Sequence, residues 1–261
     1  MLIVVAPAKA LDFESPLPTR KFTEPEMLDR SRELVSVMRG KSPDELSAMM
    51  SISPTLGEIN FERFQDWSPP FTTKNARPAV LAFNGDTYLG LDARSTFGER
   101  DYTHAQKVLR ILSGLHGVLR PLDLIQPYRL EMGSRVRTGR GDSLYEFWGG
   151  DVTDRLNADL ADSPGSSVLV NLASQEYFSV VQPDRIDGRV VSPRFEDARG
   201  DEEHKVVGFF AKRARGAMAG WIIRERIKSA RALTHFDGLG YRYIPELSST
   251  DEPVFRRRTD A

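Results

Sequence analysis

Short runs of apolar and β-branched residues alternate along this chain with segments of helical periodicity. Such runs are typical of buried strands. The sequence predicts strands at residues 2–6, 79–83, 167–172, 189–191, 206–210 and 241–244. Helical patterns lie between several of them, and this alternation indicates a mixed α/β fold.

Helix start signals divide the first quarter of the chain. Thr23 and Glu26 have the spacing of a capping box, and Ser42 and Glu45 repeat it, so helices are predicted to begin after them. A third helix is predicted after Ser53, and another over residues 104–113. No internal repeat or long linker is visible, and 261 residues suit one core. We predict a single domain spanning residues 1–261.

Composition narrows the classes of function. The chain has no Cys and only four scattered His residues, so we expect no disulfide, no metal site and no cofactor. The phosphate-binding, dinucleotide-binding and serine-hydrolase signature motifs are absent. No apolar run approaches the length of a membrane span, and the first residues lack the basic region of a signal peptide. We expect a cytoplasmic monomer that does not contact membranes.

The formal net charge of -1 hides a strong segregation of charge. Residues 105–140 carry a net charge of +5 and residues 205–231 carry +7, whereas residues 142–203 between them carry -9. Segregated basic charge can build one positive face, which is typical of a protein with a polyanionic partner. We therefore predict that the two basic segments line a common cleft. The alternative is that these charges pair across segments or lie on solvated helices.

Residues 43–67 are predicted to form two short amphipathic helices joined by Ser51, Ile52 and Ser53. This is the outline of a helix-hairpin-helix, in which backbone N–H groups of the turn bind a DNA phosphate without contacting a base. The usual module has Gly on both sides of the central apolar residue, and here both positions are Ser. A plain helical hairpin packed on the core is the alternative.

The segment 101–133 is rich in Arg. Lys107 and Arg110 lie on one predicted helix, and Arg120 and Arg129 follow in a loop stiffened by Pro. Arg in such a loop can bind a phosphate through two parallel hydrogen bonds. The alternative is a network of ion pairs that holds the loop together, for example between Arg120 and Asp123.

Polar clusters follow three of the predicted strands. In α/β sheets, ligands lie beyond the carboxyl ends of the strands, so these side chains could converge. If they meet, Glu176 and Lys9 are candidates for acid/base chemistry, and the other cations would clamp an anion. In the alternative, Ser174 caps a helix and the cations lie on a solvated helix. The cluster consists of Lys9, Asn171, Ser174, Glu176, Lys212 and Arg215.

Several longer motifs closely resemble the YaaA family of bacterial peroxide-stress proteins. They are APAKALDF (6–13), FNGDTYLGL (83–91), LSGLHGVLRPLDLIQPYRLEMG (112–133), NLASQEYF (171–178) and FFAKRARGAMAGWII (209–223). The resemblance covers nearly the whole chain in the same order. It implies an unusual α/β topology with a basic cleft and a helix-hairpin-helix, DNA binding, and protection from hydrogen peroxide that is associated with lowered free intracellular iron.

Two hypotheses follow. The first is a protein, not an enzyme, that binds double-stranded or distorted DNA independently of sequence, with Tyr128 and Trp221 as candidates for base stacking. Its phosphate ligands would be Ser51, Ile52, Ser53, Lys107, Arg110, Arg120, Arg129, Lys212, Arg213 and Arg215. The second is an enzyme that acts on a nucleotide or another small anion at the strand-end cluster.

Overall fold

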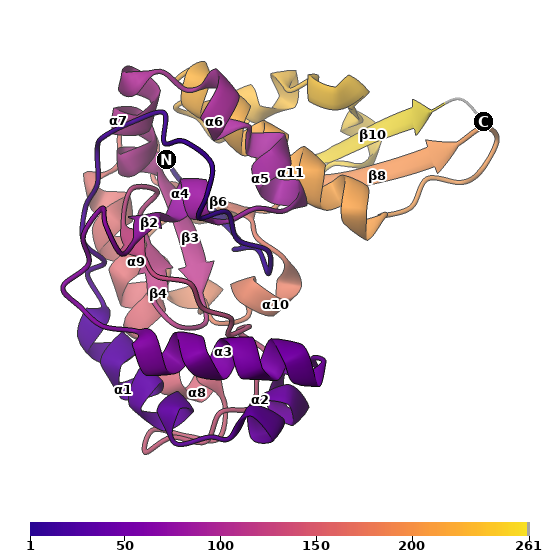
Figure 1. The fold of residues 1–261 in the computed structure, drawn as a ribbon. Coiled ribbons are helices and arrows are strands. Elements are labelled where there is room, and N and C mark those ends of the chain that lie inside the picture. The colour runs from indigo at the N-terminus through magenta and orange to yellow at the C-terminus, as the bar shows by residue number, and fades with distance from the viewer. Residues whose placement is uncertain (260–261) are drawn as a thin grey trace.

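The computed structural model describes residues 1–259, and a five-stranded sheet forms its centre (Figure 1). In order, the strands are β4 (Gly117–Leu119), β3 (Leu109–Ser113), β1 (Leu2–Val5), β6 (Val168–Leu172) and β7 (Arg189–Val191). β3, β1, β6 and β7 are parallel, and β4 is antiparallel to β3. Every residue of β1 is buried, as expected for a central parallel strand that is covered on both faces.

The strand order creates a topological switch point beside β1. From β1 the chain first passes to β3 on one side, and it later returns to β6 on the other side. The carboxyl ends of β1 and β6 therefore lie next to each other, with Val5 opposite Leu172. In open α/β sheets, ligands bind outside the strand ends at such a point.

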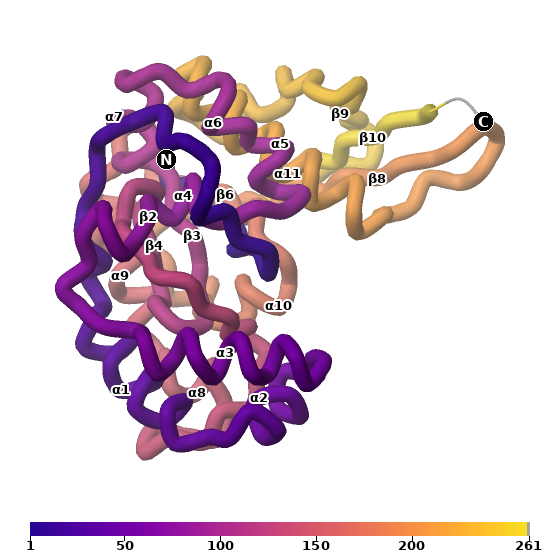
Figure 2. Tube along the Cα trace, in the orientation of Figure 1, coloured from indigo at the N-terminus to yellow at the C-terminus, as the bar shows by residue number. Residues whose placement is uncertain are grey.

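A second sheet has the order β8 (Arg194–Arg199), β10 (Val254–Thr259) and β9 (Arg242–Tyr243). Phe195 of β8 stacks on Phe255 of β10, with ring centroids 5.4 Å apart, and Tyr241 packs on Phe195. Figures 1 and 2 show this sheet extending away from the first, with the end of β10 near its tip. β2 (Arg77–Pro78) and β5 (Leu124–Ile125) form a separate antiparallel pair.

The longest helix, α11 (Gly208–Arg224), joins the two parts, since it contacts β1, β6 and β8 and packs on α5 (Asp86–Leu91). Within residues 1–259, no helix has the length and apolar character needed to cross a membrane. The other α-helices are α1 (Leu28–Arg39), α2 (Pro43–Met50), α3 (Pro54–Asp66), α4 (Ala79–Ala82), α6 (Ala93–Thr96), α7 (Glu99–Val108), α8 (Leu144–Trp148), α9 (Asp151–Asp162) and α10 (Gln175–Phe178). Four 3-10 helices cover Pro183–Arg185, Ala230–His235, Gly238–Gly240 and Pro245–Leu247.

The mixed α/β class is confirmed, and two of the three helix starts are correct. Ser42 and Glu45 form a capping box at α2, and the side chain of Ser53 accepts a hydrogen bond at the start of α3. The predicted cap at Thr23 is wrong, because Thr23 instead pairs with Asp123 and α1 begins five residues later.

Three predicted elements are also wrong. Residues 79–82 form α4, and residues 208–210 are the start of α11, so neither segment is a strand. The helix predicted over residues 104–113 ends at Val108, and the chain continues directly as β3. A short apolar run has no periodicity that separates a strand from a buried helix, which explains these errors.

Candidate functional site

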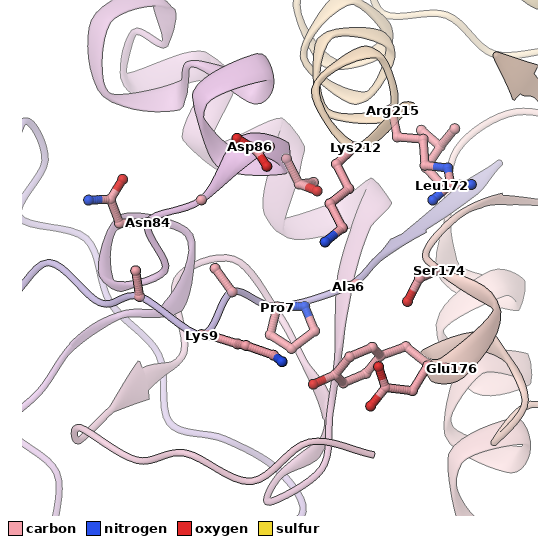
Figure 3. A pocket seen from close by; sticks show the side chains of 15 residues that line it. Ala6, Pro7, Lys9, Asn84, Asp86, Leu172, Ser174, Glu176, Lys212 and Arg215 are labelled. Carbon is pink, nitrogen blue, oxygen red and sulfur yellow. The ribbon is translucent and has the colours of Figure 1, made fainter. Parts of the chain in front are cut away.

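A cavity of about 260 Å³ lies beyond the carboxyl ends of β1 and β6, at the topological switch point (Figure 3). Four segments that are distant in sequence line it. They are residues 6–10 after β1, residues 84–87 at the start of α5, residues 172–177 from the end of β6 into α10, and Lys212 and Arg215 on α11. Two parallel strands, two helix starts and a third helix therefore converge on one space.

Two glycines fix the wall formed by α5 and α11. A Cβ atom on Gly216 would lie 1.8 Å from the carbonyl oxygen of Thr87, and one on Gly90 would lie 2.0 Å from that of Arg213. The helices can approach this closely only because both positions lack a side chain. This contact holds Lys212 and Arg215 over the cavity, where Figure 3 shows them above Ser174 and Glu176.

Arg215 is the most enclosed cation of the cavity. Its side chain is partly buried, and within residues 1–259 it forms no ion pair with a carboxylate. Burial lowers the pKa of the Arg215 guanidinium, because the charged form loses hydration. Lys212, one turn earlier on α11, is exposed and also has no ion-pair partner among the described residues.

The opposite wall carries an organised set of charges. The backbone N–H of Gly133 donates to Oε1 of Glu176 at 3.1 Å, and the hydroxyl of Tyr145 donates to the Glu176 carbonyl at 2.8 Å. Lys9 Nζ lies 3.5 Å from Oε1 of Glu131. The same oxygen accepts a 2.9 Å hydrogen bond from Arg129, while Oε2 of Glu131 is buried without a partner.

Three buried tyrosines lie in or beside this region, and one of them, Tyr177, lines the cavity. The hydroxyl of Tyr88 donates to the carbonyl of Ala6 at 3.1 Å, and Tyr128 lies 2.6 Å from the hydroxyl of Ser113 at the end of β3. Burial raises the pKa of Tyr88, Tyr128 and Tyr177, so all three hydroxyls stay neutral and act through hydrogen bonds.

The structure brings together most of the predicted strand-end cluster. Lys9, Ser174, Glu176, Lys212 and Arg215 line the cavity. Asn171 does not: its side chain donates to Ser192 and it lines a neighbouring hollow of about 640 Å³ that Arg215 also borders. Asn84 and Asp86 also line the cavity but are not among the predicted site residues, because the segment before them was predicted as a strand and is α4. The turn signal Asn-Gly-Asp at this position could have indicated them.

Several predicted phosphate ligands have other roles. Arg110 is 4% exposed and donates to Asp159 at 2.6 Å, so it cannot reach a phosphate and its assignment as a DNA ligand is wrong. Arg120 bonds with Asp123 and Glu26, as the alternative interpretation predicted. Arg129 is ion-paired with Glu131, whereas Lys107 and Arg213 are exposed and form no ion pair within residues 1–259.

The predicted cleft is therefore not built from the two basic segments as a whole. Acidic residues of the segment 142–203 neutralise part of the first basic segment: Asp159 pairs with Arg110 and Asp151 pairs with Arg140. These charges therefore pair across segments, as the alternative interpretation of the charge segregation predicts. The cations that line the cavity come from the loop after β1 and from α11.

The turn between α2 and α3 differs from the expected phosphate-binding turn. Ser51 adopts a left-handed conformation, with φ of 50°, and its N–H and that of Ile52 donate to carbonyls of α2. Two of the three turn amides are thus used to cap α2, which corrects their assignment as phosphate donors. The N–H of Ser53 forms no hydrogen bond within residues 1–259.

Other predicted features can be placed in the structure. Tyr128 is 5% exposed, so its ring is not open to a nucleotide base, whereas Trp221 is partly exposed and packs edge-on against Phe236. Among the described residues, no group of three His, Asp or Glu side chains is arranged to hold a metal ion.

Comparison with known proteins identifies the chain. The family model described as peroxide stress protein YaaA matches residues 1–247. A UPF0246 protein of Cellvibrio japonicus (strain Ueda107) is 51% identical over 257 residues, which cover 98% of this chain and 98% of the relative. The likeness therefore extends over nearly the whole length of both chains. The chain belongs to the YaaA family of peroxide stress proteins.

Proposed function

We propose that this peroxide stress protein acts by binding DNA through its phosphates, independently of sequence. The observation that carries the proposal is the charge on the first turns of α11. Lys212 and Arg213 are both exposed, and neither forms an ion pair within residues 1–259, whereas Arg110, Arg120 and Arg129 are each paired with carboxylates. Unpaired, exposed cations are the groups that can exchange counterions for phosphates.

Cations continue from α11 toward the α2–α3 hairpin. Lys9 faces the same cavity as Lys212, and Glu131 links Lys9 to Arg129. Burial lowers the pKa of Arg63 on α3, and the nearby charge of Arg129 lowers it further. The positive charge of Arg129 thus acts on Arg63, and a bound phosphate would relieve the repulsion between the two guanidinium groups.

Two groups on this path could contact DNA in other ways. The N–H of Ser53, at the start of α3, has no partner within residues 1–259. This backbone donor could therefore bind a DNA phosphate. Phe209 is 52% exposed and lies one turn before Lys212 and Arg213. Its ring would offer a stacking surface for an unpaired base in distorted DNA.

A salt series tests the proposal. Fluorescence anisotropy with a labelled duplex should give an affinity that falls steeply with salt and depends little on base sequence. Replacing both Lys212 and Arg213 by Gln should reduce the log–log slope by about 0.9 for each lost phosphate contact. A flat salt response, or a strong preference for one base sequence, would contradict phosphate binding.

Ser53 allows a matched pair of variants. Its φ of −64° suits Pro, so Ser53→Pro removes the N–H with little change of backbone, and Ser53→Ala removes the capping hydroxyl but keeps the N–H. We expect Ser53→Pro to weaken DNA binding by roughly 1–2 kcal/mol relative to Ser53→Ala, the scale of a hydrogen bond to a charged group. Equal affinities would remove the hairpin from the proposal. Circular dichroism must show that the helices of both variants survive.

The cellular part of the proposal is that cells expressing this protein hold less free iron during peroxide stress. Electron paramagnetic resonance of chelated ferric iron in whole cells measures it. The Lys212→Gln, Arg213→Gln double variant should lose protection together with DNA affinity. If the variant still protects cells after it has lost DNA binding, protection does not depend on DNA binding and the proposal is contradicted.

A further inference from the structure

The cavity beyond β1 and β6 has features that binding of a long polyanion does not explain. It lies at the topological switch point, and four segments enclose it. A DNA strand continues on both sides of each phosphodiester and needs an open groove. A cavity of about 260 Å³ is near the small end of ligand pockets, which start at about 300 Å³, so its size suits a small molecule.

The charges of the cavity are arranged on two sides. Lys212 and Arg215 approach from α11, and Lys9 approaches from the loop after β1. Glu176 and Asp86 supply carboxylates at the rim. Lys9 forms an ion pair with Glu131, and Glu176 accepts a hydrogen bond from the Gly133 N–H. In contrast, Arg215 and Lys212 have no carboxylate partner within residues 1–259.

Arg215 is the informative group. A partly buried guanidinium without a counter-ion is costly, and burial lowers its pKa accordingly. An anion bound beside it would restore the lost interaction. The planar guanidinium can donate two parallel hydrogen bonds to phosphate oxygens, and Lys212 adds a point charge at the mouth. The Gly216 contact with α5 holds both side chains in place.

We propose that this cavity binds a small phosphate monoester of the size of a nucleoside monophosphate. Its phosphate lies between Arg215 and Lys212, and the hydroxyl of Ser174 lines the wall that faces them. Glu176 and Asp86 accept hydrogen bonds from hydroxyl or amino groups of the rest of the ligand. This is the binding part of the enzyme hypothesis. It shares Lys212 with the proposal for DNA, but it rests on Arg215 and on the enclosed cavity.

Isothermal titration calorimetry of the full chain with AMP, inorganic phosphate and adenosine tests the inference. We expect AMP to bind, inorganic phosphate to bind more weakly, and adenosine not to bind. Arg215→Gln should weaken AMP binding by about tenfold or more, the effect of one charge-assisted hydrogen bond. Arg213→Gln removes the same charge from the same turn of α11, but its side chain lies outside the cavity, so AMP affinity should change less than about twofold.

Two controls keep the outcomes distinct. Lys212→Gln changes an exposed side chain that need not disturb folding, and it should also weaken AMP binding. Thermal unfolding of each variant shows whether it is folded. The inference is overturned if neither AMP nor phosphate binds at millimolar concentration, or if Arg213→Gln weakens AMP binding as much as Arg215→Gln does. AMP binding that persists in a protein without affinity for DNA would refute only the DNA proposal.

Discussion

His116 is a single buried residue that makes the free energy of unfolding depend on pH. It is fully buried among Trp67, Phe71 and Tyr128, and its Nδ1 lies 3.0 Å from the hydroxyl of Ser31. Nε2 is buried without a hydrogen-bond partner. Burial lowers the pKa of His116 from 6.5 to about 3, because the charged imidazole would lose its hydration there.

The sign of the resulting pH dependence follows from proton binding. Between pH 6.5 and 3 the unfolded chain protonates His116 and the folded chain does not, so the free energy of unfolding falls as the pH falls. The slope from this group is up to about 1.4 kcal/mol per pH unit. His116→Gln should remove that slope in urea titrations between about pH 4.5 and 6.5.

A matched variant separates this effect from the other histidines. His235 is exposed, so His235→Gln keeps the number of buried groups unchanged. Burial also lowers the pKa of His104, which acts in the same direction, so the comparison is between the two variants and the original chain. A slope in His116→Gln equal to that of the original chain would refute the assignment.

Asp159 explains at the same scale why Arg110 is structural. Burial acts to raise the pKa of Asp159, but hydrogen bonds from Arg110 and Arg155 outweigh burial and lower it. The carboxylate therefore stays charged, and Arg110 stays paired with it. Sequence could not reveal this pair, because its members lie 49 positions apart on β3 and α9.

At the scale of elements, the contact between α5 and α11 decides the shape of the cavity. Gly216→Ala would place a Cβ atom 1.8 Å from the Thr87 carbonyl oxygen and 2.8 Å from the Leu91 N–H nitrogen, and both are backbone atoms that cannot rotate away. We expect this variant to lower the free energy of unfolding by more than about 2 kcal/mol, as overpacking does. Urea denaturation measures the change.

Gly208 provides the control on the same helix. A Cβ atom there would meet nothing within 4 Å, so Gly208→Ala should leave stability unchanged or raise it slightly through helix propensity. If both variants lose stability equally, close packing at Gly216 is not what holds the helices together.

The elements also show what the sequence can predict. The strands at β1 and β6 were predicted because their residues are apolar and buried, and the cluster at their ends followed from them. The run at 206–210 misled, because Val206, Phe209 and Phe210 are exposed at the start of a helix. The apolar character of these exposed residues therefore does not indicate a strand.

Two strands of the second sheet were missed for the opposite reason. β8 and β10 are rich in charge, and their apolar content is too low for a strand pattern. Their register places Arg256 opposite Glu196 and Arg257 opposite Asp197, and both pairs are ion-paired. Cross-strand charge pairs stabilise a sheet, but their partners are 60 positions apart and cannot be matched from one sequence.

At the scale of the whole molecule, α11 links the two sheets. One end of the helix, at Lys212 and Arg215, lines the cavity beside the first sheet. Near its other end, Trp221 packs on Phe236, which in turn contacts Phe195 of the second sheet. Separating the two sheets would expose the face of α11 that packs on one of them. The predicted single domain therefore depends on this shared helix.

We therefore predict that the chain unfolds in one cooperative transition. Labelling with 5-fluorotryptophan gives one ¹⁹F resonance for each Trp, assigned through Trp→Phe variants. Trp67 and Trp148 report on the part around the first sheet, and Trp221 reports on the part around the second. If α11 couples the two parts, all three resonances should convert to the unfolded signal at the same urea concentration. Conversion of the Trp221 resonance at a lower concentration would instead show two domains, and the segment 1–261 would have to be divided at α11.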